Sequence, residues 1–292
     1  MSASNDPEAV RKQYATDEML RIRQETHEKY TVPKIDFVDW AVRCIQWRGD
    51  ERVLDVGSGT GLYFNALQRI LPGLVYHGVD LSEGMLHQHP ASGVRMTLGD
   101  AQALPYADHS FDVLMANHML YHLPDIDAAL TEFRRVLKPD GILMVATNSL
   151  HNMPEIQVLM RRAIVLLTRL GPSQVRAPTP ASDLFALENG TRQLARHFFA
   201  VVRYDLPTSL VFNDVEPAIR YLESTRNMRE PQLPDDVLWD DVMLIMRQQI
   251  THLVNHFGEL AIAKINGVLL ATDRGGFIEG FVERGGTSAK SQ

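Results

Sequence analysis

Between residues 52 and 147 the chain alternates short apolar segments with amphipathic ones. The apolar segments have the length of strands and stand at 52–56, 74–80, 94–98, 111–117 and 142–147. Helices are expected between them, at 62–71, from residue 82 or 83, and at 125–137. Because strands linked by helices form right-handed crossovers, such strands lie parallel in one sheet that helices cover on both faces. The pattern therefore predicts an α/β fold.

A glycine-rich turn follows the first of these strands, with glycines at Gly57, Gly59 and Gly61. Glycines there allow a tight turn and the close approach of a ligand. A dinucleotide site has the spacing G-x-G-x-x-G, which would place the third glycine where Leu62 stands. Asp55, just before the turn, would repel a pyrophosphate but suits a cationic amino group. The turn therefore favours an adenosine cofactor with an ammonium group over a dinucleotide.

Further acids recur along the same alternating region. Asp80 ends the second strand, Asp100 follows the third, and Asp112 stands in Ser110-Phe111-Asp112, which opens the fourth. Any one of them could be a turn acid or a helix cap. Taken together and placed at strand ends, where open α/β sheets bind ligands, they indicate a binding site. A carboxylate at Asp80 could accept both ribose hydroxyls, and one at Asp100 the adenine amino group.

The motifs of this region resemble, in order, those of class I S-adenosylmethionine-dependent methyltransferases, in particular the small-molecule branch. The resemblance covers residues 34–148 and rests on segments 55–61, 78–82 with Met85, 99–101, 110–112 and 134–141. It implies a Rossmann-like, seven-stranded, mostly parallel sheet with helices on both faces. It also implies a reversed last strand, for which 267–272 is the candidate.

The resemblance also implies a cofactor site for S-adenosyl-L-methionine. The glycine turn and its acid would contact the methionine moiety, Asp80 the ribose, and Leu81 and Met85 the two faces of the adenine. Asp100 and Ala101 would contact the adenine edge, and Asn117 would lie near the amino-acid end. Tyr14 belongs to an N-terminal flap that would close over the cofactor. The expected cofactor-binding residues are thus Tyr14, Asp55, Gly57, Ser58, Gly59, Gly61, Asp80, Leu81, Met85, Asp100, Ala101 and Asn117.

Two histidines, His118 and His122, follow the fourth strand at the mouth of this expected site. Either could act as a general base, since the ordinary histidine pKa lies near 6.5. The alternative is a scaffold role, because a sulfonium methyl needs a base only when the acceptor must lose a proton early. The other histidines, including the pair His252 and His256, have no third partner at metal-ligand spacing, so no metal is expected.

The rest of the chain is less regular. A helix is expected to begin at Pro33, another at 184–199, and a strand at 201–212 that is interrupted near Pro207. We expect a helical flap at 1–33, a cofactor-binding core at 34–150, a helical lid with one strand at 151–260, a final strand at 261–283 and a frayed tail at 284–292. The apolar helix expected at 153–170 is either a packing helix or part of a lid over the substrate. Its apolar face could also form a homodimer.

Composition limits the partners. The chain has 36 acidic and 29 Lys or Arg residues, a net charge of −7, which opposes nucleic-acid binding. It has no apolar run of about 20 residues that could span a bilayer and no apolar signal core. Cys44 is the single cysteine. These features predict a cytoplasmic protein without stable membrane insertion.

The expected activity is in-line transfer of a methyl group from S-adenosylmethionine to an O, N or C atom of a small molecule. Two alternatives remain at this point. One is an NAD(P)-dependent oxidoreductase of related fold, and the other is a non-catalytic S-adenosylmethionine-binding protein that acts through a partner.

Overall fold

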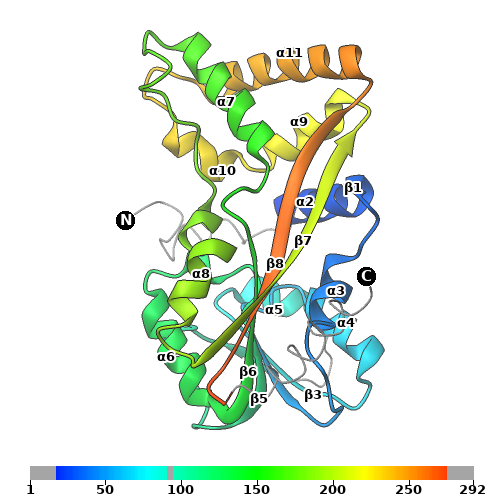
Figure 1. The fold of residues 1–292 in the computed structure, drawn as a ribbon, viewed down its shortest axis with the longest axis vertical. Helices are drawn as coiled ribbons and strands as arrows, with labels where there is room; N and C mark the ends of the chain where they lie inside the picture. The colour runs from blue at the N-terminus through cyan, green and yellow to red at the C-terminus, as the bar shows by residue number, and fades with distance from the viewer. Residues whose placement is uncertain (1–17, 91–94, 275–292) are drawn as a thin grey trace, which may run out of the picture. The chain divides into compact units, whose positions relative to one another are not determined.

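The computed structural model describes residues 18–90 and 95–274. Its central feature is an eight-stranded sheet with the order β1-β7-β8-β6-β5-β2-β3-β4 (Figure 1). The strands are β1 (Thr31–Val32), β2 (Arg52–Val56), β3 (Val75–Asp80), β4 (Arg95–Leu98), β5 (Phe111–Met115), β6 (Leu137–Asn148), β7 (Ala200–Phe212) and β8 (Leu260–Thr272). The strands from β4 to β6 pair in parallel, and the C-terminal strands form an antiparallel pair. The α/β class predicted from the sequence is confirmed.

The expected count of seven strands is wrong by one. The additional strand, β1, pairs antiparallel with β7, with Thr31 opposite Leu210 and Val32 opposite Ser209. A two-residue strand carries no periodicity, so the sequence offers no signal for it. Pro33 was expected to begin a helix, but it follows β1, and helix α3 (Phe37–Val42) begins four residues later.

Helices fill the connections. They are α2 (Glu18–Tyr30), α4 (Leu62–Ile70), α5 (Glu83–Gln88), α6 (Ile126–Val136), α7 (Pro154–Leu167), α8 (Leu187–Leu194), α9 (Val215–Glu223), α10 (Arg226–Arg229) and α11 (Trp239–Phe257). Side chains cap two of these helices at the start that the sequence predicts. Ser82 accepts from the N–H of Met85 at 3.4 Å, and Asp125 accepts from the N–H of Ala128 at 2.9 Å.

One predicted interruption is absent. Strand β7 continues through Pro207, where a break was expected. The pairing of β7 with β1 ends at Ser209, so Pro207 lies beyond the paired residues, on an outer edge of the sheet. A proline costs no ladder hydrogen bond at such an edge. The neighbouring helix α8 is also shorter than the expected 184–199.

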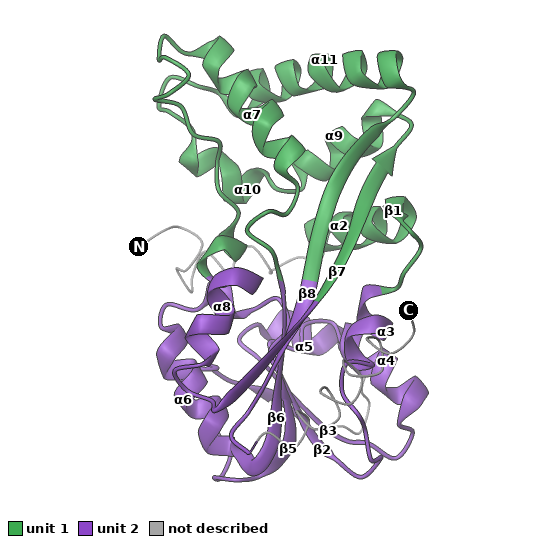
Figure 2. Cartoon of the chain, viewed as in Figure 1, with its two compact units in different colours: residues 1–36, 148–184, 205–266 green, residues 37–147, 185–204, 267–292 purple. Residues whose placement is uncertain are grey.

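The chain divides into two compact units (Figure 2). Unit 1 falls within residues 1–36, 148–184 and 205–266, and unit 2 within 37–147, 185–204 and 267–292. Each unit has its own apolar core. In unit 2, buried side chains of α3 and α4 pack with those of the central strands, among them Phe64, Leu67, Val113 and Met115. All described residues of the expected cofactor site fall in unit 2.

Unit 1 is built mainly from α7, α9 and α11. Trp239, Phe212 and Met246 are among its buried side chains. One face of α7, carrying Ile156 and Met160, belongs to this core, which supports a packing role for that face. None of the helices in the described part of the chain combines the length and hydropathy needed to cross a membrane.

Unit 1 also buries an amine. Lys264 is 7% exposed, and its Nζ donates to Thr31 Oγ1 at 3.4 Å. No charged group among the described residues contributes to the pKa shift of Lys264, which burial alone causes. Burial lowers the pKa of Lys264 to about 8. The folded state therefore binds fewer protons than the unfolded state between about pH 8 and 10.5, and the contribution of Lys264 to stability rises across that range.

Lys264→Met is accordingly expected to raise the free energy of unfolding at pH 7 by about 1–3 kcal/mol, because it removes an uncompensated buried charge. It should also flatten the dependence of stability on pH above about 8. Urea unfolding of both proteins at several pH values measures this, with the exposed Lys34→Met as a control. A less stable Lys264→Met variant with an unchanged pH dependence would refute the interpretation.

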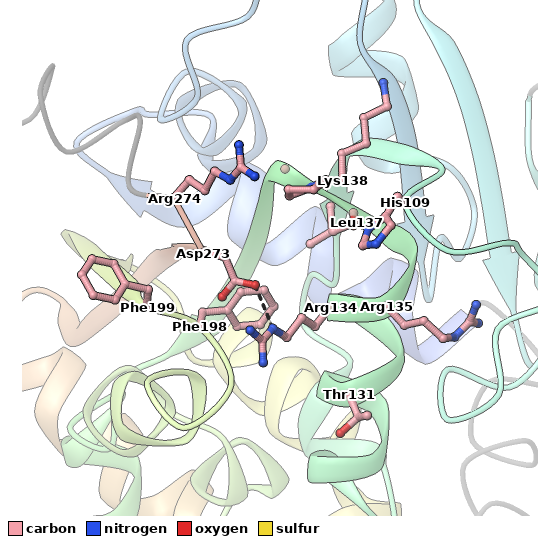
Figure 3. A pocket seen from close by; sticks show the side chains of 12 residues that line it. His109, Thr131, Arg134, Arg135, Leu137, Lys138, Phe198, Phe199, Asp273 and Arg274 are labelled. Atoms are coloured by element: carbon pink, nitrogen blue, oxygen red, sulfur yellow. Dashed lines mark hydrogen bonds and ion pairs between the residues drawn. The ribbon is translucent and has the colours of Figure 1, made fainter.

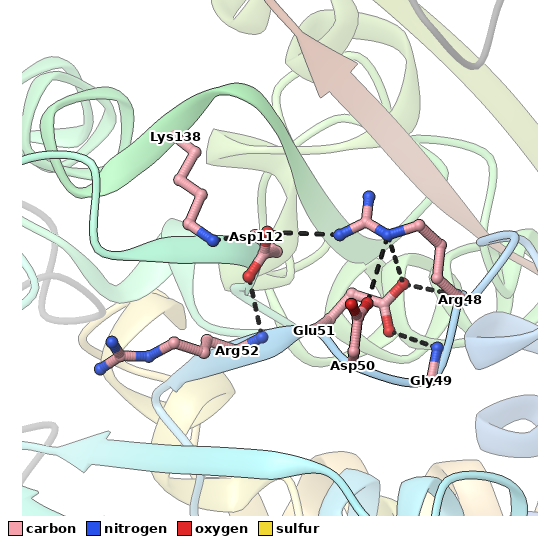
Figure 4. A network of polar contacts seen from close by, with 7 residues as sticks. All are labelled: Arg48, Gly49, Asp50, Glu51, Arg52, Asp112 and Lys138. Atoms are coloured by element: carbon pink, nitrogen blue, oxygen red, sulfur yellow. Dashed lines mark hydrogen bonds and ion pairs between the residues drawn. The ribbon is translucent and has the colours of Figure 1, made fainter.

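Charged side chains form ion pairs and hydrogen bonds at the edge of the sheet where β2 and β5 begin (Figure 4). Asp112 accepts from Lys138 Nζ at 2.8 Å, from Arg48 Nη2 at 3.4 Å and from the N–H of Arg52 at 3.0 Å. Burial acts to raise the pKa of Asp112, but these contacts outweigh it and lower the pKa. The expectation that Asp112 stands with the other acids at the ligand-binding edge is wrong, because it lies where β5 begins and not where it ends.

Candidate functional site

The glycine turn has the conformation that its sequence indicates. Gly57, Gly59 and Gly61 adopt positive φ values of 70°, 54° and 80°. A Cβ on Gly57 would lie 2.9 Å from the Cβ of Met119, so a side chain there would also collide with the turn after β5. The loop therefore needs glycine at Gly57 for its conformation and for its close packing.

Asp80 ties this loop to the end of β3. Its Oδ2 accepts from the N–H of Gly59 at 2.9 Å, and its Oδ1 accepts from the N–H of Ser82 at 2.8 Å. Burial raises the pKa of Asp80, and these backbone hydrogen bonds partly offset the rise. Each carboxylate oxygen has a second lone pair, so Asp80 can hold the loop and still accept from ligand hydroxyls.

Asp55 is buried beneath the loop, with 2% of its surface exposed. Its Oδ2 accepts from the hydroxyl of Tyr76, on β3, at 2.7 Å. Burial raises the pKa of Asp55 to about 7, the Tyr76 hydrogen bond acts to lower it, and the nearby Asp80 acts to raise it. The carboxyl is therefore about half protonated near pH 7. A cationic group placed beside it would favour the charged form.

Two buried polar atoms at the strand ends lack a protein partner among the described residues. They are Ser58 Oγ, in the glycine loop, and Asn117 Nδ2, just after β5. The side-chain oxygen of Asn117 is used, since it accepts from the N–H of Ala146 at 2.9 Å. Buried polar atoms are normally satisfied, so these two fit a site that a polar ligand completes. With the glycine loop, they fit the amino-acid part of the expected cofactor.

The side chains expected around the adenine have different surroundings. Met85 is buried, Ala101 is 5% exposed, and Leu81 is half-buried. Asp100 is exposed, and its Oδ1 accepts from the N–H of Gln102 at 2.9 Å and from Gln102 Nε2 at 3.1 Å. The acid is thus oriented by its own turn. Tyr14 lies outside the described residues.

The two candidate histidines stand in the turn after β5. His118 has a φ of 55°, and its N–H donates to the carbonyl of Ala146 at 2.8 Å. Its ring centroid lies 5.6 Å from that of Phe37. His122 closes a short 3₁₀ turn (Leu120–His122), and its ring contacts Tyr121 edge-on. Left-handed backbone at a non-glycine residue is often found at functional sites, but these contacts by themselves support a scaffold role equally well.

Sequence reasoning missed Tyr76 and His89. The ring of His89 lies beside Gly61, where an added Cβ would come within 2.8 Å of its Nε2. Tyr76 was detectable in principle, since strand alternation places it on the same face as Gly78, which pairs with Asp55. The position of His89 depends on the chain path after α5 and leaves no local signal. Among the described residues, no group of three His, Cys, Asp or Glu side chains could hold a metal ion.

A cavity of about 620 Å³ lies elsewhere in unit 2 (Figure 3). It is next to the start of β6 and is lined by Arg134, Phe198, Phe199 and Asp273, among others. Arg134 Nε donates to Asp273 Oδ2 at 2.8 Å, so this arginine is already paired. Because β6 is parallel to β2, this cavity lies at the edge of the sheet opposite the glycine loop.

The candidate site lies in a segment that matches a known protein family. Residues 54–145 match the methyltransferase domain family, and this segment includes the described cofactor candidates and both histidines. Residues 54–145 therefore form a class I methyltransferase domain. The matched segment contains the glycine loop, the acid at the end of β3 and the turn after β5.

Curated relatives match mainly in this domain. The chain is 35% identical over 115 residues to malonyl-(acyl-carrier protein) O-methyltransferase of Methylococcus capsulatus, which covers 38% of this chain and 42% of that protein. It is 34% identical over 141 residues to demethylmenaquinone methyltransferase of Corynebacterium efficiens, covering 48% and 59%. The chain thus spans about half the length of these curated relatives.

Likeness to solved structures extends further along the chain. The (4+2)-cyclase SpnF superposes with a TM-score of 0.54 at 16% identity, over 91% of this chain and 97% of that one. At this identity the likeness shows the fold alone. The fold is therefore found with a chemistry other than methyl transfer, and reaction type has to be argued from the site.

Proposed function

We propose that this chain transfers a methyl group from S-adenosylmethionine to an O, N or C atom of a small molecule. The observation that carries the proposal is the glycine loop held to Asp80 by the Gly59 hydrogen bond, inside a matched methyltransferase domain. The buried Asp55 and the unsatisfied atoms of Ser58 and Asn117 support it. The glycine spacing and the family match both oppose an NAD(P)-dependent oxidoreductase.

The chain's own contribution is binding and orientation. Asp80 would accept the ribose hydroxyls, Asp55 would face the ammonium group, and Leu81 and Met85 would enclose the adenine next to Asp100 and Ala101. When bound, the sulfonium cofactor supplies an electrophilic methyl group. Alignment of the acceptor with that methyl group, by positioning alone, can provide on the order of 7–11 kcal/mol at best.

The histidines are proposed to act through position and not as bases. We expect His118→Gln and His122→Gln to retain kcat to within about tenfold, because transfer from a sulfonium needs little help with the leaving group. Initial rates and the pH profile of kcat measure this once folding has been checked. A loss of about 10²–10⁴ in kcat with unchanged cofactor affinity would instead make that histidine the general base.

A second function, cofactor binding without methyl transfer, is the alternative that the sequence left open. The site residues argued above would hold the cofactor, and none of them assigns an acceptor. Incubation with methyl-labelled S-adenosylmethionine and a set of acceptors separates the two functions. The set should include a malonyl thioester and a demethylated quinone, the acceptor classes named for the relatives. Label in any acceptor supports the transferase, while cofactor binding without label in any acceptor supports the second function.

The division into flap and lid, the location and the assembly of the chain are also proposed. A flap at 1–33 and a lid at 151–260 are proposed from the sequence, and the apolar composition of 151–260 suits an aromatic or lipid-like acceptor. A cytoplasmic location and a homodimer through α7 are proposed from the sequence. Val158 and Leu166, on α7, are 66% and 64% exposed and would contribute to that dimer.

A further inference from the structure

Three ionisable side chains form a connected chain beside the glycine loop. Tyr76 on β3 donates its hydroxyl hydrogen to Asp55 Oδ2 on β2 at 2.7 Å. The Tyr76 hydroxyl oxygen also lies 3.4 Å from Nε2 of His89, the residue that follows α5. The chain therefore joins three separate elements of unit 2.

The outer end of this chain is packed against the loop itself. The His89 ring centroid lies 5.3 Å from that of Phe64, on α4, and 5.8 Å from that of Tyr76. A Cβ on Gly61 would come within 2.8 Å of His89 Nε2. Because Asp55 lies two residues before Gly57 and His89 lies beside Gly61, the three side chains connect both ends of the loop.

The charges around Asp55 leave its carboxylate with little support. From β3 it faces the Tyr76 hydroxyl, which stabilises the charged form, and Asp80, which opposes it. Beyond Tyr76 lies His89, whose pKa is lowered by burial and which is neutral near pH 7. Tyr63, on α4, is buried in the same apolar cluster as Tyr76. No cation is among the groups that perturb Asp55, so an ionised carboxylate depends on Tyr76 and on whatever cation a ligand brings.

We propose that Tyr76, with His89 behind it, is a positioning residue that holds Asp55 in the orientation and charge state needed for the cofactor's ammonium group, and that it makes cofactor binding depend on pH near neutrality. This inference rests on the proposed function. Tyr76 acts through Asp55 and does not itself contact the cofactor.

The sign of the pH dependence follows from linkage. In the free protein Asp55 is protonated below about pH 7, and a bound ammonium group favours the ionised form. Binding at lower pH therefore releases a proton, so affinity increases with pH up to about 7 and then levels off. Below that point the expected change is about tenfold in Kd per pH unit.

Calorimetric titration with S-adenosylhomocysteine tests this, because it carries the same amino-acid group. Titrations from about pH 5.5 to 8.5 are needed, in pairs of buffers with different ionisation enthalpies, so that proton release is counted directly. Tyr76→Phe should weaken binding at pH 7 by about 10- to 100-fold, the range for loss of one hydrogen bond to a charged group. It should also move the level part of the profile to higher pH. Asp55→Asn should remove the pH dependence.

A matched control is Tyr221→Phe, which removes the hydroxyl of a buried tyrosine in unit 1 that donates to Met153 Sδ. It should keep the wild-type affinity and profile. Wild-type binding without proton release, or a Tyr76→Phe profile equal to that of the wild type, would overturn the inference while leaving the proposed function intact. Failure of the wild type to bind S-adenosylhomocysteine at any pH would reject both. The wild-type proton count needs no variant, so the test holds even if Tyr76→Phe does not fold.

Discussion

Asp80→Ala is expected to weaken binding of S-adenosylhomocysteine by about 100-fold, close to 3 kcal/mol. The variant loses a charged acceptor for the ribose hydroxyls. It also leaves the N–H groups of Gly59 and Ser82 without the oxygens that now accept from them, so the glycine loop loses its tie to β3. Calorimetry at neutral pH measures the change in Kd.

Two variants act as controls for this result. Asp80→Asn keeps one oxygen that can accept from the loop but loses the charge, so its affinity should lie between those of wild type and alanine. Asp100→Ala removes an exposed acid that is bonded to Gln102, and the effect should be smaller than that of Asp80→Ala. Unchanged affinity in a folded Asp80→Ala protein would remove Asp80 from the site.

Gly267→Ala is expected to lower the free energy of unfolding by about 3 kcal/mol or more, the upper range for forcing an extra carbon into a packed site. A Cβ at Gly267 would lie 2.3 Å from the carbonyl oxygen of Tyr204 and 2.9 Å from a methyl group of Leu187. Since the nearer atom belongs to the backbone of β7, a side-chain rotation cannot relieve the contact. Urea unfolding measures the loss.

Gly73→Ala is the matched control, because a Cβ there would meet nothing within 4 Å. Its stability should stay within about 0.5 kcal/mol of wild type. Near-equal stability of the two variants would show that β7 and β8 can separate at Gly267 without cost, contrary to the packing described.

The alternating pattern predicted the strands from β2 to β6 because each of them is flanked by turn or cap residues. Ser82 and Asp125 illustrate this, since the same side chains that mark a helix start in the sequence accept hydrogen bonds at that start. Strand β1 was not predictable, because its two residues acquire their conformation from pairing with Leu210 and Ser209, about 180 residues away in the sequence. The break predicted at Pro207 was wrong for a related reason. Strand β7 tolerates a proline there because Pro207 lies beyond the residues that pair with β1.

The candidate site was predicted in its positions but not in its electrostatics. The order of motifs identifies Asp55 and Asp80 as acids at strand ends. Their neighbours come from other strands, and the sequence does not show that Asp55 is buried against Tyr76. Burial changes the chemistry, because the pKa of about 7 makes the charge of Asp55 conditional, where the sequence suggested a permanent carboxylate. Asp112 shows a different error, since it opens its strand already in the sequence and therefore lies at the amino end of β5, away from the acids at the carboxyl ends.

The most direct test of the central claim, that the glycine loop and Asp80 form an S-adenosylmethionine site, is a calorimetric comparison of S-adenosylhomocysteine with NAD⁺ on the wild-type chain. We expect saturable binding of S-adenosylhomocysteine at one site per chain, weakened by Asp80→Ala, and no binding of NAD⁺. Binding of NAD⁺ that Asp80→Ala weakens, with none of S-adenosylhomocysteine, would contradict the claim.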